Sequence, residues 1–224
     1  HMDLIDPHKR EQEMEQVMRW VDLYTAYESP VVVLGSKPVD RRAFDLHQHV
    51  HTVVQTLNTT AAIIRERGKI CCFHPHTGTA VETETEIGMV MDAVDVDVVR
   101  FAPDCGQIGK GGADPLRIIQ DYHDIIGMVH LKDYIGGPIE YSADGKEIDK
   151  TGYLGYTPLG EGALDIAGMV RYLEQIDYDG YASVELDGNQ WSPIRIEDAI
   201  VPQQEALAIS KRFLQNLGYS FKTE

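Results

Sequence analysis

The chain has 224 residues, of which 43% are hydrophobic and 25% are charged, which is typical of a soluble globular protein with a sizeable core. Its 20 basic and 36 acidic residues give a net charge of −16, which argues against binding to nucleic acid or to an anionic membrane surface. No apolar stretch approaches the roughly 18 residues of a membrane span, no signal peptide opens the chain, and the three cysteines include no CxxC pair, so we expect a cytoplasmic protein.

Helix-like and strand-like segments alternate along the chain. Continuous apolar runs indicate parallel strands that are buried on both faces. Thr83 and Glu86 form a capping-box signal, and Pro115 is typical of the first turn of a helix. A loop rich in Gly, Tyr and Asp is expected over 134–162, and a loop of this length is usually functional. The expected elements are, in order, helix 7–28, strand 30–35, helix 41–67, strand 70–73, helix 83–93, strand 96–101, helix 115–126, strand 127–131, helix 165–175, strand 181–185 and helix 197–217.

Five strands, each followed by a helix, predict a parallel sheet in an α/β fold, either as a closed barrel or as an open doubly wound sheet. No G-x-G-x-x-G opens a helix, which excludes the phosphate-binding turn of a dinucleotide fold. The run Gly109-Lys110-Gly111-Gly112 lacks the spacing and the Ser/Thr of a P-loop. Without an internal repeat or linker, we expect a single domain over residues 1–224.

Polar side chains lie at the carboxyl ends of four successive predicted strands: His74, Asp104, His130 and Glu185. In a βα barrel these ends converge on one face, where the loops form the active site. Each residue alone has a structural alternative, such as a hydrogen-bonded histidine, a capping aspartate or a glutamate paired with an arginine. Together they favour a metal site, because unpaired buried carboxylates are costly. Mixed nitrogen and oxygen ligands suit Mn²⁺, Co²⁺, Fe²⁺ or Zn²⁺ better than Ca²⁺.

Several short motifs in this order resemble the xylose-isomerase-like TIM-barrel family of sugar phosphate isomerases and epimerases, and most closely its inosose dehydratase-like branch. The motifs are His74-Pro-His-Thr-Gly-Thr79, Asp104-Cys-Gly-Gln107, Gly111-Gly-Ala-Asp-Pro115, His130-Leu-Lys-Asp133, Pro158-Leu-Gly-Glu-Gly162 and Val184-Glu185. The similarity runs from about Pro30 to Trp191.

The resemblance implies a (β/α)8 barrel with one divalent metal held by His74, Asp104, His130 and Glu185. Many relatives carry a metal-binding Glu at the position of His74, and the family's Asp-x-Gly-His ends here in Gln107. The five expected strands also fall short of eight, so we expect a barrel that lacks its first strands, with an N-terminally incomplete domain. A shortened chain and completion by a partner subunit or swapped dimer are both open explanations.

We expect a metal-dependent isomerase or epimerase that forms an enediolate on a keto-sugar or inosose, with Mn²⁺ preferred and Co²⁺, Zn²⁺, Fe²⁺ or Mg²⁺ as alternatives. Glu185 is the candidate base, His76 a hydrogen-bonding group or proton donor, and Lys132 a stabiliser of negative charge. The candidate substrate-binding residues are Gln107, Glu161 and Trp191.

Two other functions are consistent with the same residues. Loss of a β-hydroxyl from the enediolate would make the protein an inosose-type dehydratase, that is, a lyase. A non-catalytic subunit, or a partial barrel completed by a partner, is the alternative from another class. We also expect a homo-oligomer. A DNA-repair endonuclease of the same fold is disfavoured by the net charge of −16.

Overall fold

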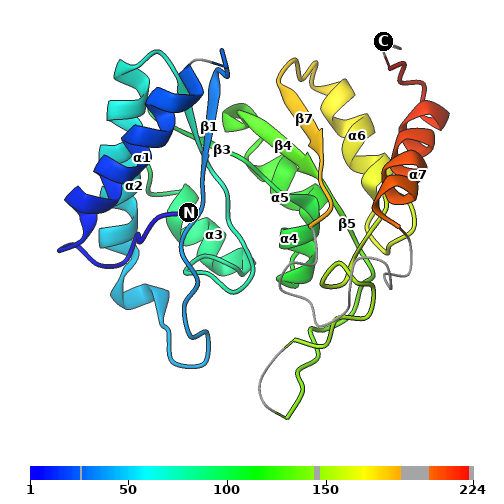
Figure 1. Cartoon of the computed structure of the whole chain (residues 1–224), viewed down its shortest axis with the longest axis horizontal. Coiled ribbons are helices and arrows are strands. Elements are labelled where there is room, and N and C mark those ends of the chain that lie inside the picture. The colour runs from blue at the N-terminus through cyan, green and yellow to red at the C-terminus, as the bar shows by residue number, and fades with distance from the viewer. Residues whose placement is uncertain (26, 144–146, 188–201, 222–224) are drawn as a thin grey trace.

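Parallel strands form the central layer of the molecule, and helices cover its outer side (Figure 1). The computed structural model describes residues 1–25, 27–143, 147–187 and 202–221. The strands pair in two groups, β1-β2-β3 and β4-β7, and parallel bridges from Phe101 to Ile126 and from Asp104 to His130 join β3 to β4. The five predicted parallel strands are therefore confirmed, in the order β1-β2-β3-β4-β7. They are β1 (Val31–Leu34), β2 (Ile70–Phe73), β3 (Val99–Phe101), β4 (Met128–Leu131) and β7 (Tyr181–Val184).

The helices bury one face each against this layer. In α2, for example, Leu57, Ala61 and Ile64 recur at helical spacing and are fully buried, which gives the helix one apolar face. In Figure 1, α1 and α2 lie beside β1, and α6 and α7 lie beside β7. The helices are α1 (Arg10–Thr25), α2 (Val50–Glu66), α3 (Glu84–Met91), α4 (Cys105–Lys110), α5 (Pro115–Asp121), α6 (Ile166–Gln175) and α7 (Gln203–Asn216), with 3-10 turns at Leu46–Gln48 and His123–Ile125.

The start expected for the second helix is wrong. The prediction began this helix at residue 41, whereas α2 begins at Val50. The Asp45 side chain accepts a hydrogen bond from the His47 backbone N–H and caps a short 3-10 turn instead. Side chains of this kind compete with helical hydrogen bonds near their own backbone. The capping box before α3 is confirmed, with both reciprocal hydrogen bonds between Thr83 and Glu86 present.

Two further features were absent from the sequence prediction. Helix α4 follows β3 directly, and a short antiparallel pair, β5 (Asp133–Tyr134) with β6 (Tyr156–Thr157), lies within the stretch expected to be a loop. The carboxylate of Asp133 accepts hydrogen bonds from the backbone N–H groups of Gly160 and Gly162, which ties the loop to the end of β4. Of the helix expected over 197–217, residues 197–201 lie outside the described residues.

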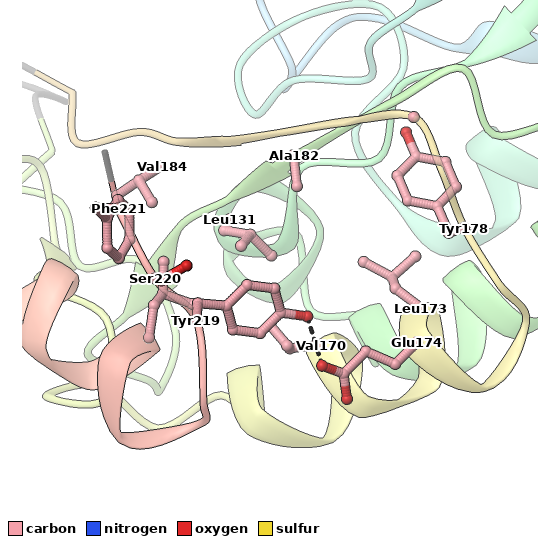
Figure 2. A pocket seen from close by; sticks show the side chains of 12 residues that line it. Leu131, Val170, Leu173, Glu174, Tyr178, Ala182, Val184, Tyr219, Ser220 and Phe221 are labelled. Carbon is pink, nitrogen blue, oxygen red and sulfur yellow. Dashed lines mark hydrogen bonds between the residues drawn. The ribbon is translucent and has the colours of Figure 1, made fainter. Parts of the chain in front are cut away.

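An apolar hollow lies on the outer side of β4 and β7, between these strands and α6 and α7 (Figure 2). Leu131 and Val184 face it from the strands, and Tyr219 donates a hydrogen bond to Glu174 at its rim, 2.7 Å between heavy atoms. Successive side chains of a strand point to opposite faces, so His130 and Glu185, next to Leu131 and Val184, belong to the other side of the layer.

Among the helices of the described residues, none has the length and the apolar composition of a membrane span.

Candidate metal centre

His74 directly follows β2 and is held in place by two backbone contacts. Its N–H donates to Leu34 O at 2.8 Å, which extends the pairing of β2 with β1, and its ring Nδ1 lies 3.4 Å from Ala102 O. A carbonyl accepts hydrogen bonds, so this contact requires the proton on Nδ1 and leaves Nε2 as a lone-pair donor. Burial lowers the pKa of His74 to about 3, and the ring is therefore neutral near pH 7, as metal ligation requires.

The two carboxylate oxygens of Asp104 make different contacts. Oδ1 accepts a hydrogen bond from the Gln107 backbone N–H at 2.9 Å and so caps α4. Oδ2 faces the side chains from the neighbouring strands, 3.0 Å from Lys132 Nζ and 3.6 Å from His130 Nδ1. Burial acts to raise the pKa of Asp104, but the Lys132 ammonium and the other hydrogen-bond donors hold it well below its usual range. The carboxylate is therefore both a helix cap and a fixed negative charge in the site.

His130, in β4, and Glu185, just after β7, meet because the two strands are paired. The Glu185 N–H donates to Leu131 O at 3.0 Å, and Glu185 Oε2 lies 3.2 Å from His130 Nδ1. One ligand atom from each of His74, Asp104 and His130 lies within 4.8 Å of the others. The side chain of Glu185, which is 40% exposed, joins this group from the more open side.

The side chains fit a divalent metal ion. Three buried atoms converge here without a well-aligned hydrogen bond in the described part of the chain: Asp104 Oδ2, His130 Nδ1 and Glu185 Oε2. The two oxygens have only the Lys132 ammonium at ion-pair distance. Buried polar atoms are nearly always hydrogen-bonded, so three such atoms pointing at one place favour a cation as their common partner. Two imidazoles and two carboxylates also form a donor set that suits first-row divalent metals.

Lys132 is a buried cation beside these ligands. Its side chain is 1% exposed, and Nζ lies 3.0 Å from Asp104 Oδ2, 3.2 Å from Glu185 Oε2 and 3.1 Å from Asp187 Oδ2. Burial alone would lower the pKa of Lys132, but the three carboxylates outweigh burial and raise it above its usual range. The stem packs so tightly that a Cβ at position 106 would lie 2.6 Å from Lys132 Cγ, so glycine is required there.

Gln107 holds a second layer of side chains. Its Oε1 accepts hydrogen bonds from the N–H and the hydroxyl of Thr77, at 3.2 and 2.7 Å. Its Nε2 lies 2.8 Å from His76 Nε2 and 3.2 Å from Asp187 Oδ2, and donates to both. The His76 Nδ1–H donates to Thr77 O at 2.8 Å, so both ring nitrogens of His76 contact protein groups. Burial acts first to lower the pKa of His76, and the ring is neutral.

Glu161 does not join this group. Glu161 is exposed and lines a separate hollow together with Tyr156 and Thr157. Trp191 lies outside the described residues. The structure thus brings together His74, Asp104, His130, Glu185 and Lys132, with Gln107 and His76 one layer behind them.

Sequence reasoning missed Asp187 and Tyr156. Asp187 follows Glu185 by two residues, and the period of two along a strand is a signal that could have placed both on one face. Tyr156 carries no such signal. Its ring lies 4.8 Å from Lys132 Nζ and 4.8 Å from Lys110 Nζ, in contacts that join residues far apart in the chain.

Comparison with known proteins places this chain in a family. The model of a family described as xylose isomerase-like TIM barrel matches residues 1–217. The chain belongs to the xylose isomerase-like TIM-barrel family. The predicted TIM-barrel fold class is therefore confirmed.

Two curated proteins to which this chain is similar are named inosose dehydratase. The protein from Clostridium perfringens is 30% identical over 142 residues, covering 61% of this chain and 46% of its own length. The protein from Geobacillus kaustophilus is 33% identical over 138 residues, covering 61% and 45%. The chain thus spans about half the length of these relatives.

Among solved structures, the IOLI protein with a binding zinc atom has a TM-score of 0.68 at 18% identity, covering 95% of this chain and 71% of that one. At this identity the likeness concerns the fold. The five parallel strands, in the order β1-β2-β3-β4-β7, thus form a large part of a xylose isomerase-like barrel. His74, Asp104, His130 and Glu185 lie at the carboxyl ends of these strands.

Proposed function

We propose that this chain carries the metal centre of a divalent-metal-dependent enzyme that isomerises or epimerises a keto-sugar or keto-cyclitol through an enediolate. The observation that carries this proposal is the convergence of Asp104 Oδ2, His130 Nδ1 and Glu185 Oε2, which are buried and make no well-aligned hydrogen bond in the described residues. With His74, these groups would hold the metal. When bound, the cation supplies the positive charge that makes a C–H bond beside a carbonyl acidic.

Glu185 is the group best placed to take a proton from the substrate. Its side chain is 40% exposed, whereas those of Asp104 and His130 are 0% and 11% exposed, so a substrate that enters from solvent meets Glu185 first. Lys132 retains its proton beside three carboxylates and would stabilise the negative charge that develops on the substrate oxygen. The two groups lie 3.2 Å apart and can act on neighbouring atoms.

His76 and Gln107 have supporting roles in this proposal. The two ring nitrogens of His76 bind Gln107 and Thr77 O, and the Gln107 amide also binds Thr77 and Asp187. We therefore assign both residues to orienting the site. Direct hydrogen bonding of His76 to a substrate hydroxyl would first require the ring to leave Gln107. Glu161 and Trp191 stay candidates for contacts with the outer part of the substrate.

Dehydration is the second candidate function. The same enediolate gives an isomer when a proton returns to the neighbouring carbon, and an epimer when a proton returns to the original carbon from the opposite face. It gives an unsaturated ketone when the β-hydroxyl takes up a proton and leaves as water. The curated relatives named inosose dehydratase favour the second outcome, as does the resemblance of the His74 motif to the dehydratase-like branch. We keep isomerisation or epimerisation as the first candidate because it is the broader class of reaction. Identifying the product would distinguish it from dehydration.

We propose Mn²⁺ as the preferred ion. Imidazole and carboxylate ligands in equal number also suit Co²⁺, Zn²⁺ and Fe²⁺, with Mg²⁺ disfavoured by the two nitrogen ligands. The zinc atom of the IOLI protein supports a divalent metal in this fold. Elemental analysis of protein prepared with each metal would rank these ions.

The test of function combines metal loading with product analysis. Protein loaded with Mn²⁺, Co²⁺ or Zn²⁺ is incubated in D₂O with 2-keto-myo-inositol and with ketohexoses, and the products are followed by NMR. We expect solvent deuterium in the carbon next to the carbonyl, and Glu185→Gln should abolish its uptake. The control variant Asp179→Asn removes an exposed carboxylate at the opposite end of β7 and should behave as wild type. Metal-loaded wild-type protein that incorporates no deuterium into any of these substrates contradicts the proposal.

A further inference from the structure

The charged groups of the described residues around the candidate metal centre sum to a charge that one divalent cation would balance. They are three carboxylates, from Asp104, Glu185 and Asp187, and one ammonium, from Lys132. With both histidines neutral, as ligation requires, three negative charges and one positive charge leave a net charge of −2. A bound divalent cation would therefore neutralise the group only if Lys132 stays charged within it.

Lys132 and a metal ion compete for the same two oxygens. The ammonium lies 3.0 Å from Asp104 Oδ2 and 3.2 Å from Glu185 Oε2, and both atoms belong to the set without a well-aligned hydrogen bond that we assign to the metal. When these oxygens bind a cation, Lys132 loses two of its three anionic neighbours and gains a positive one. A buried ammonium in that position is strongly disfavoured without another partner.

Lys132 also has no path to solvent. Its side chain is 1% exposed, and its stem packs against Gly106, where even a methyl group would clash. Among the described residues, the remaining anionic partner is Asp187, whose Oδ2 lies 3.1 Å from Nζ. That same oxygen accepts a hydrogen bond from Gln107 Nε2 at 3.2 Å, and Gln107 is itself fixed by Thr77. Asp187 is therefore a counter-ion in a fixed place, outside the group of converging ligand atoms.

We propose that Asp187 is a positioning residue that holds the Lys132 ammonium when Asp104 and Glu185 bind a divalent cation, so that the cation and the ammonium coexist in one site. This inference rests on the proposed metal centre and deepens it. Asp187 sets metal affinity through Lys132 and not through a bond to the metal. Gln107 contributes by fixing the Asp187 carboxylate.

The test measures metal affinity, with no substrate present. The metal-free full chain is titrated with Mn²⁺ and Zn²⁺ against a chelating indicator, for wild type, Asp187→Asn, Asp187→Ala, Lys132→Met and the double variant Lys132→Met with Asp187→Asn. Asp187→Asn should weaken binding by about 10- to 100-fold, the range known for partners that support metal ligands. In the Lys132→Met background the same change should alter affinity by about threefold or less, because the ammonium that needs Asp187 is gone.

Asp179→Asn is the matched control, because it removes one carboxylate from the same strand segment at its exposed amino end. It should bind both metals as wild type does. Circular dichroism reports folding of every variant. If Asp187→Ala fails to fold, Asp187→Asn, which keeps the shape of the side chain, decides the question.

The outcomes separate this inference from the proposed function. Wild-type protein that binds neither metal refutes the metal centre itself. Wild-type protein that binds metal, with unchanged affinity in Asp187→Asn, overturns the role of Asp187 and leaves the centre intact. Equal weakening by Asp187→Asn with and without Lys132 also overturns it, because Asp187 would then act on the metal directly.

Discussion

Mild acid should destabilise the metal-free protein through His74. The ring is buried, and burial lowers its pKa from 6.5 to about 3. As the pH falls below 6.5, the unfolded chain takes up a proton at this histidine, while the folded chain does not until about pH 3. Stability that is present above pH 6.5 is therefore lost progressively as the pH falls towards 3.

The size of the effect follows from the pKa difference. Each pH unit between the two pKa values costs about 1.4 kcal/mol, so a solution at about pH 5, roughly 1.5 units below the unfolded pKa, should cost about 2 kcal/mol. The nearby carboxylate of Asp104 acts in the opposite direction, and the depressed pKa already includes its influence. Full protonation of the folded state would require more acid than most folded proteins tolerate.

Urea unfolding in the presence of a chelator measures this cost. The free energy of unfolding is determined at about pH 7.5 and about pH 5 for wild type, for His74→Asn and for the control His51→Asn, which changes an exposed histidine on α2. Between these two pH values, the free energy of unfolding of wild type and of His51→Asn should fall by about 2 kcal/mol more than that of His74→Asn. Equal losses in all three proteins would refute the role of His74. The loss would then come from titrating groups that the three proteins share.

Three further changes test the surroundings of the site. Asp104→Ala should cost about 1 kcal/mol more in the free energy of unfolding than Asp104→Asn, since asparagine keeps the cap of α4, and equal values from urea unfolding would show that the cap contributes nothing. Gly106→Ala should destabilise the chain by about 1–3 kcal/mol, because the new Cβ would lie 2.6 Å from Lys132 Cγ; a higher melting temperature would contradict this packing. Asp133→Ala leaves the N–H groups of Gly160 and Gly162 without their acceptor and should cost at least about 2 kcal/mol, with faster amide exchange at both glycines, whereas unchanged exchange would argue against the tie.

The regular elements of the fold were largely predictable because their signals are local. Continuous apolar runs such as 70–73 predicted buried parallel strands, and Thr83 with Glu86 predicted the start of α3. Helix α4 was missed because its six residues include two glycines and show no hydrophobic period. Its start was nonetheless visible, since Asp104 precedes Gln107 by the three residues typical of a capping signal.

The candidate ligands were predictable from topology alone, because the carboxyl ends of neighbouring parallel strands meet. His74, Asp104 and His130 do lie together, as that reasoning requires. The surroundings of Lys132 could not be predicted in the same way. Its contact with Asp187 joins residues 55 positions apart, and the contact depends on side-chain directions that no short motif records.

In the first turn of α4, the backbone and the side chain of residue 107 serve different groups. Asp104 is oriented by the backbone N–H of residue 107, whereas the 107 side chain reaches away to Thr77, His76 and Asp187. A different side chain at 107, including the histidine of the family motif, would leave the anchoring of the aspartate unchanged. A substitution at this position would therefore change the polar contacts on one wall of the site while the backbone keeps the Asp104 carboxylate in the same orientation.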